Sequence, residues 1–318
     1  MTLQGWIQIA LLLVVVTALT PVAGGYMARV YSGEHVLLDR AFGPLERLLY
    51  RAMRTDAAHE QDWRSYAKSV VVFSLLFWLV LYLILRTQGI HPWNPEGFRS
   101  GTWDVSFNTA SSFITNTNWQ YYAGETTLSY FSQMAGLAVQ NFVSAAVGMA
   151  VVAAVIRGFA RRSGKTLGSF WVDLVRTHLY ILLPISVVGA LVLVSQGVIQ
   201  NLSPYEHFHT LTGASSTLAL GPVASQEVIK ELGTNGGGFF NVNSAMPFEN
   251  PNGLTNFFEM FLILIIPAGG STRSARSPGR AGSCCSWTRC PRHRSTGGAP
   301  RGRSPRSPQR PLCSPRSS

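Results

Sequence analysis

The sequence predicts an all-α membrane protein that contains a helix, re-entrant loop, helix unit twice. Three observations predict this class: charged residues are scarce, they are separated from long apolar stretches, and two loops of unusual composition each follow a short helix. Apolar residues make up 47% of the 318-residue chain and charged residues only 13%, about half the charged share of an ordinary soluble domain. Because a helix needs ~20 apolar residues to cross a bilayer, the long uncharged stretches indicate membrane spans.

Four stretches with few or no charges are long enough to cross a bilayer: residues 1–27, 69–85, 126–156 and 177–229. The last contains only Glu206 and Glu227 as charged residues and has its apolar part at about 179–194. A fifth apolar segment starts near Leu254, and its pattern stops at Pro267. The sequence therefore predicts four complete spans and a fifth that is cut short.

Basic residues are concentrated in two loops, 29–68 and 157–176. Loops rich in Arg and Lys remain in the cytoplasm, so we expect both loops there, the first partly helical around 44–53, and the N-terminus outside. A cleaved signal peptide is the alternative for the first span. A signal peptide begins with a positively charged region, whereas no basic residue precedes Arg29.

The second unusual loop runs from Gly233 to Asn241, with the sequence GTNGGGFFN. In lipid every backbone N–H and C=O must be satisfied, so a glycine run survives at membrane depth only inside protein or beside a water-filled cavity. Without Cβ atoms, glycines reach backbone conformations closed to other residues and let carbonyl oxygens converge. A cation that has lost its hydration shell needs such a group of oxygens, so the run indicates an ion path.

The first loop, 115–120, has the sequence TNTNWQ and follows a short helix predicted at 104–114. The same spaced apolar pattern follows each loop: Leu128, Phe131 and Met134 after the first, Leu254, Phe257 and Met260 after the second. Two copies of one unit explain this better than the alternative, two unrelated turns. Both units, 104–120 and 223–241, are expected to enter the membrane from the outer face.

Polar residues near the loops receive two interpretations. Gln133, Gln140 and Asn141 interrupt the third span among small residues, which favours close helix packing. The charged residues that flank the loops are expected at the membrane interface, with an outer vestibule as the alternative: Glu125, Glu227, Lys230, Glu231 and Glu249.

The net charge of +11 lies in the C-terminal segment. Residues 271–318 hold eleven Arg and no Lys or acid, which leaves 15 basic against 15 acidic residues elsewhere, so we expect no nucleic-acid partner. Rich in Arg, Ser, Pro and Gly, this tail is too poor in apolar residues to fold. A disordered arm, a lipid-binding segment and a shifted reading frame are the alternatives; we favour the shifted frame, because composition changes abruptly near Pro267. The four cysteines also lie there, without the spacing of a zinc site.

Five runs near the loops carry a family resemblance: 112–120, 124–137, 221–227, 233–241 and 247–251. They resemble the potassium-binding A subunit of the Kdp potassium-transporting ATPase, and the similarity covers residues 1–267. It implies a potassium-channel-like fold with four helix–re-entrant loop–helix repeats, of which this chain supplies two of the expected four. It also implies K⁺ as the transported ion and no catalysis by this chain. The implied partners are an ATP-hydrolysing P-type subunit and two small subunits, and the implied location is the bacterial plasma (inner) membrane.

The resemblance further implies the residues that select the ion. They are Thr115, Asn116, Thr117 and Asn118 in the first loop, Thr234, Asn235 and Gly236 in the second, and Gln120 near the ion path. Because two repeats provide only half of a fourfold ring, we expect that the chain as given does not transport potassium. The alternatives are a truncated membrane fragment without transport activity and, more remotely, a membrane hydrolase that uses Glu125 or Glu249.

The expected organisation follows from these segments. It comprises an extra N-terminal transmembrane helix (1–28), a cytoplasmic loop (29–68), the first pore repeat (69–156), a second cytoplasmic loop (157–176), a truncated second pore repeat (177–267) and a basic tail (268–318).

Overall fold

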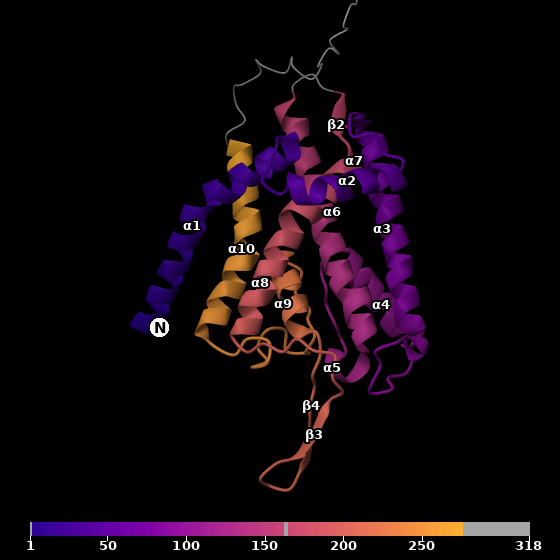
Figure 1. Ribbon diagram of the computed structural model, residues 1–318, viewed down its shortest axis with the longest axis vertical. Coiled ribbons are helices and arrows are strands. Elements are labelled where there is room, and N and C mark those ends of the chain that lie inside the picture. Colours follow the sequence, from indigo (N-terminus) through magenta and orange to yellow (C-terminus); the bar gives the residue numbers. More distant parts are fainter. Residues whose placement is uncertain (1, 162–164, 276–318) are drawn as a thin grey trace, which may run out of the picture. The chain divides into compact units, whose positions relative to one another are not determined.

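The computed structural model describes residues 2–161 and 165–275, and the side chains only as far as residue 271. The basic segment 276–318, whose composition predicts no packed structure, lies outside the described residues. Within the described part, five helices are long and apolar enough to cross a membrane: Leu3–Ser32, Trp63–Arg86, Ser132–Ala160, Phe170–Ser195 and Gly253–Ser271. The prediction of an all-α membrane protein is thereby confirmed (Figure 1).

Two of the five spans contain wider helical turns. The third begins as a π-helix, Ser132–Ala138, and continues as α6, Val139–Ala160. The fourth begins as α7, Phe170–Arg176, passes through a π-helix, Thr177–Leu182, and ends as α8, Leu183–Ser195. Pro184 at the start of α8 has no N–H to donate, which is consistent with an irregular ladder at this point.

The helix α10 runs from Gly253 to Ala275 and passes through Pro267. The prediction that the fifth span stops at Pro267 is therefore wrong. α10 packs against α1, Leu3–Ser32, and the contact is close where glycines meet: a Cβ on Gly269 would lie 3.1 Å from the Gly24 nitrogen. Small residues allow such close packing of helices in lipid, so the partner helix stabilises α10 beyond the proline.

The two basic loops meet at one end of the helices. The first contains α2, Asp39–Ala52, as its sequence predicts, and β1, Gln61–Asp62; the second contains β2, Thr166–Gly168. β1 and β2 pair as antiparallel strands, and the Arg176 Nε donates to Glu46 Oε1 over 3.1 Å, which links α7 to α2.

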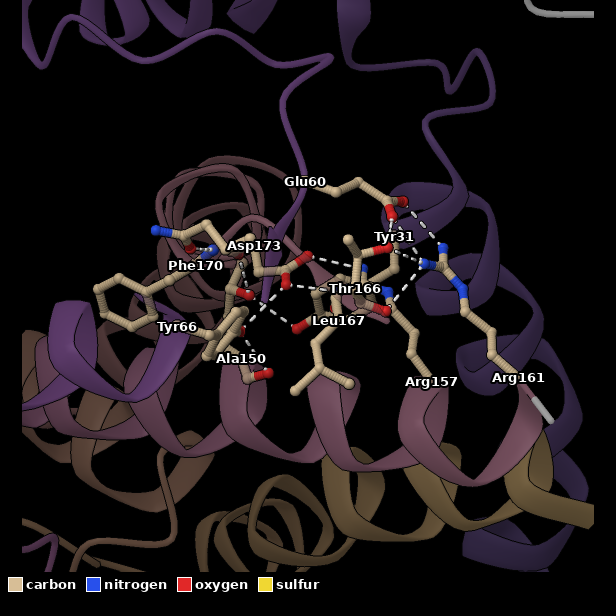
Figure 2. A network of polar contacts seen from close by, with 12 residues as sticks. Tyr31, Glu60, Tyr66, Ala150, Arg157, Arg161, Thr166, Leu167, Phe170 and Asp173 are labelled. Atoms are coloured by element: carbon tan, nitrogen blue, oxygen red, sulfur yellow. Dashed lines mark hydrogen bonds and ion pairs between the residues drawn. The ribbon is translucent and has the colours of Figure 1, made fainter. Parts of the chain in front are cut away.

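A buried ion pair joins the helices beneath these loops (Figure 2). Arg157 contacts both carboxylate oxygens of Asp173, with Nη1–Oδ2 at 2.5 Å and Nη2–Oδ1 at 2.7 Å. The Tyr66 hydroxyl of α3, Trp63–Arg86, lies 3.1 Å from Asp173 Oδ2 and 2.8 Å from the Ala150 carbonyl. Three spanning helices are thus tied together at this end.

The opposite end carries the connections between the spans and the short helices. It includes a hairpin of β3, Glu206–His209, and β4, Ser215–Leu218, paired in the register His207 to Thr217. The hairpin projects away from the helices on the side opposite α2 (Figure 1). Leu211, in its connecting turn, is fully exposed.

Candidate functional site

Two short helices, α4, Trp103–Ile114, and α9, Val223–Leu232, precede the two predicted loops. At 1.5 Å per residue, α4 is about 18 Å long and α9 about 15 Å, roughly half the ~30 Å thickness of a bilayer core. Neither helix is long enough to cross a membrane. Each of them is therefore suited to enter a membrane and end inside it.

The chain returns to its starting end after the first short helix. Gln88, directly after α3, accepts from the Ser129 N–H over 3.0 Å and donates to the Thr127 carbonyl over 2.8 Å. These two residues follow the first loop and precede the third span. The segment between Gln88 and Thr127 therefore leaves and rejoins the same end of the helices, as a re-entrant unit requires.

The second unit is closed in the same manner. Gln196 follows α8, and its Oε1 accepts from Asn252 Nδ2 over 3.4 Å, immediately before α10 begins. At the start of α9, the Ala224 N–H donates to the Ile199 carbonyl over 2.9 Å. In both units a glutamine at the end of a spanning helix contacts the residues just before the next one.

The two loops lie against each other and against α6. The Ser144 hydroxyl of α6 donates to Asn116 Oδ1 of the first loop over 2.8 Å, and Asn235 Nδ2 of the second loop lies 3.1 Å from the same hydroxyl. Asn235 Nδ2 also donates to Asn116 Oδ1 directly. Ser144 is therefore a shared support for both loops.

Further contacts extend this pairing along the loops. Gln120 Oε1 accepts from the Gly238 N–H over 3.0 Å, and its Nε2 lies 3.4 Å from the Gly238 carbonyl oxygen. Asn118 Nδ2 donates to Asn141 of α6. Two amides of the third span, Asn141 and Gln133, thus support the loops, Gln133 through the Phe239 carbonyl at 3.4 Å, whereas the sequence interpretation favoured helix packing.

The backbone of both loops has an unusual conformation. The φ angle is positive at Asn116 (61°) and Asn118 (52°) in the first loop, and at Thr234 (54°), Gly236 (75°) and Gly237 (65°) in the second, so the sign of φ alternates as far as Gly236. The residues between them have ordinary φ values. Alternation between left-handed and right-handed conformations aligns successive peptide planes, so N–H groups face one side and carbonyl oxygens the other. Such a backbone is suited to present several oxygens to one ion.

The predicted filter residues divide into two groups. The side chains of Thr115, Thr117 and Thr234 are exposed. Asn118 and Asn235 are buried, Asn116 and Gln120 are half-buried, and Gly236 is half-buried. The structure therefore places hydroxyl groups on the open side of the loops and uses the amides to hold the loops in place. The available donors are carbonyl and hydroxyl oxygens, which suit a large monovalent cation.

Sequence reasoning did not select Gly237, the residue at which the loops approach most closely. Its φ is 65°, and a Cβ there would lie 2.6 Å from the Asn118 carbonyl oxygen and 3.1 Å from Gln120 Oε1. At Gly236 the nearest atoms to a Cβ would be Asn243 Nδ2 at 3.9 Å and the Thr117 carbonyl oxygen at 4.0 Å. Three consecutive glycines are equivalent in sequence, and only the neighbouring loop distinguishes them.

Four of the five charged residues that flank the loops are buried inside the protein, which their sequence pattern does not indicate. Glu227, Lys230, Glu231 and Glu249 are buried, and Lys230 has no exposed surface. Glu125 is half-buried, and its Oε2 accepts from the Asn241 N–H over 3.0 Å. These buried charges pack against the glycine run inside the protein. Charges that merely flank a loop in the sequence do not reveal such burial.

Comparison with known proteins agrees with this architecture. The family described as the potassium-transporting ATPase A subunit matches residues 10–275. The chain belongs to the potassium-transporting ATPase A subunit family. This confirms the resemblance and extends it beyond the predicted limit at residue 267, in agreement with the helical continuation of α10.

Relatives within the A subunit family are similar over most of the chain. A protein of Methylorubrum extorquens is 59% identical over 268 residues, which are 84% of this chain and 47% of the relative. Proteins of Rhodospirillum centenum and Mycobacterium bovis are 55% and 56% identical, over 87% and 82% of this chain and 50% and 46% of theirs. Each is named as the potassium-binding subunit of a potassium-transporting ATPase. The chain spans about half the length of the curated relatives it matches.

Proposed function

We propose that this chain is a potassium-binding and translocating subunit of an ATP-driven, high-affinity potassium uptake complex. In this proposal K⁺ enters from the extracytoplasmic side and is selected at the loops 115–118 and 234–236, with Gln120 beside the path. The observation that carries the proposal is the pairing of two re-entrant loops through Asn116, Asn235 and Ser144, together with their alternating backbone conformation.

The orientation that we propose follows from the distribution of charge. The two basic loops meet through β1 and β2, and basic loops remain in the cytoplasm. The N-terminus and both re-entrant units lie at the other end of the helices (Figure 1), which we assign to the outside of the bacterial inner membrane. ATP hydrolysis belongs to a P-type partner subunit in this proposal, and two small subunits complete the complex.

The exposure of Thr115, Thr117 and Thr234 indicates how the site is completed. A dehydrated ion needs oxygens on all sides, and the described loops provide them on one side. In lipid, exposed loop amides would remain unsatisfied at a cost of several kcal/mol each. We therefore propose that further loops of the assembled protein cover this side.

Potassium binding in lipid nanodiscs, by the chain assembled with the further loops that complete its site, tests the proposal. A ligand that binds only the folded state stabilises it, by about 2.7 kcal/mol at a concentration of 100 Kd, so K⁺ should raise the temperature of unfolding more than Na⁺ at equal ionic strength. Gly236→Asp places a side chain where the carbonyl oxygens converge and should abolish this difference. Leu211→Ala, in the exposed hairpin turn, is the matched control and should retain it.

Equal stabilisation by K⁺ and Na⁺ in the wild-type chain would refute the proposal, as would a K⁺ preference that survives Gly236→Asp. Growth of a potassium-uptake-deficient bacterium at micromolar potassium, with the partner subunits supplied, tests transport separately from binding.

A further inference from the structure

A buried lysine lies directly behind the second loop. Lys230 is on α9, has no exposed surface, and its Nζ lies 2.6 Å from Glu227 Oε2 and 3.8 Å from Glu231 Oε1. Both carboxylates are buried as well. Moving charges out of water costs several kcal/mol per ion unless they are paired and hydrogen-bonded. The contacts made by this group must therefore offset that cost.

The carboxylates of this group hold the backbone that follows the glycine run. Glu249 is fully buried, and its Oε1 accepts from the Phe240 N–H over 3.2 Å while its Oε2 accepts from the Ser244 N–H over 2.9 Å. The Ser244 hydroxyl lies 2.6 Å from Glu227 Oε1 and 3.0 Å from Glu231 Oε1. The segment 240–244 is thus attached to α9 through Glu227 and Glu231, the two carboxylates that lie beside the Lys230 ammonium group.

The ammonium group also packs against the loop itself. A Cβ on Gly238 would lie 2.8 Å from Lys230 Nζ and 3.2 Å from Glu249 Oε1, so any larger residue here would displace the ammonium group. The Gly238 N–H donates to Gln120 of the first loop over 3.0 Å. Lys230 therefore lies on one side of Gly238 and the first loop on the other.

We propose that Lys230, held by Glu227 and Glu231, is a positioning residue that fixes the backbone of 236–240 against the first loop and thereby sets potassium affinity and the preference for potassium over sodium. This inference rests on the proposed function of the two loops. Lys230 does not contact the ion, because its Nζ is buried behind the loop among carboxylates. It acts through Gly238 and these two carboxylates.

The mechanism is electrostatic and geometric. Without the ammonium group, Glu227 and Glu231 are buried carboxylates that lack a neutralising cation, and breaking a buried pair by removing one partner is strongly destabilising. Replacing both members of a pair with neutral groups is often neutral for stability. The two kinds of replacement therefore separate an effect on folding from an effect on the loop.

The test measures stability and cation preference in the same variants of the assembled protein in nanodiscs. Lys230→Met should lower the unfolding temperature and weaken K⁺ binding. The double variant Glu227→Gln with Lys230→Met should be more stable than Lys230→Met but retain a K⁺ affinity at least about tenfold weaker than wild type, with a reduced ratio of K⁺ to Na⁺ affinity. Lys230→Arg retains the charge but not the fit beside Gly238, so it should also reduce that ratio.

A second buried ion pair provides the matched control. Arg157 and Asp173 lie at the basic end, with side chains 15% and 3% exposed, away from both loops. Arg157→Met with Asp173→Asn should change stability without changing the ratio of K⁺ to Na⁺ affinity.

The outcomes distinguish the inference from the proposed function. If the stable double variant at Glu227 and Lys230 binds K⁺ with wild-type affinity and preference, Lys230 is only a structural residue and the inference is wrong, while the proposed function remains. If the control pair changes the ratio equally, positioning by Lys230 is likewise refuted. If the wild-type chain itself shows no preference for K⁺, the proposed function fails and the inference fails with it.

Discussion

Gly237 provides the sharpest test of whether the two loops depend on their close approach. Gly237→Ala would place a Cβ 2.6 Å from the Asn118 carbonyl oxygen. This oxygen belongs to the backbone, so the first loop must move. Gly236→Ala is the matched control, because Gly236 also has a positive φ, 75° against 65°, but its Cβ would meet nothing closer than 3.9 Å.

The expected difference in K⁺ affinity between the two variants follows from these distances. Both alanines adopt a left-handed conformation, which costs about 1–2 kcal/mol, and this cost is common to the pair. Only Gly237→Ala adds overpacking, which typically costs about 1–3 kcal/mol. We therefore expect the K⁺ affinity of Gly237→Ala to be roughly 5- to 150-fold weaker than that of Gly236→Ala.

The assay is K⁺ binding by the assembled protein in nanodiscs, with the unfolding temperature recorded for each variant. The reasoning is refuted if Gly236→Ala weakens K⁺ binding as much as Gly237→Ala does. In that case the conformation of the glycine run, rather than its contact with Asn118, would determine the geometry of the site.

Three further predictions concern other parts of the chain. Ser144→Ala removes the hydroxyl shared by both loops and should weaken K⁺ binding by about tenfold, since a net hydrogen bond contributes about 0.5–1.5 kcal/mol and this one supports two loops. Hydrogen bonds from Arg161 lower the pKa of Glu60 from 4.5 to about 2. The pairing of Glu60 with Arg161 therefore stabilises the fold above about pH 4.5, and this stabilisation is lost as the pH falls toward 2. Arg161→Gln should remove this pH dependence of the unfolding temperature. Cysteines introduced at Arg54 and His207 should be labelled from the cytoplasm and from the outside, respectively.

Each of these predictions has its own control. Ser195→Ala removes a hydroxyl near the outer end of α8 that donates only to the Val192 carbonyl, and it should leave K⁺ binding unchanged. Because Glu60 is largely exposed, the effect of Arg161→Gln should be small and should decrease further in high salt. Labelling of residue 54 from the outside would reverse the proposed orientation.

The spans and the paired loops could be predicted because their signals are local. Length and absence of charge define a span within its own sequence, and the loops are recognised by their glycines and by the pattern that follows them. The end of α10 could not be predicted in this way. Its continuation past Pro267 depends on contact with α1 through Gly24 and Gly269, and these glycines are about 245 positions apart in the sequence.

The sequence predicted which residues form the two loops, but not the division of roles among them. Asparagine and threonine both carry oxygens that a cation can use, so the sequence TNTN gives no reason to separate them. In the structure the positive φ at Asn116 and Asn118 accompanies side chains that contact α6, whereas Thr115 and Thr117 remain exposed. Asparagine is among the few residues that tolerate a left-handed conformation, so these positions favour it for the backbone as well as for its amide.

The buried charges support the second loop on the side that faces the protein interior. Polar residues of α6 hold the first loop, and Lys230 with its carboxylates holds the second. The exposed Thr234 is joined to this second group through its backbone, because its N–H donates to the Glu231 carbonyl over 3.0 Å. If ion selectivity depends on fixed backbone oxygens, substitutions at these supports should change the preference for K⁺ over Na⁺ as strongly as substitutions in the loops. If it depends only on the number of oxygens, Thr117→Ala should have a large effect, and the stable double variant at Glu227 and Lys230 should have none.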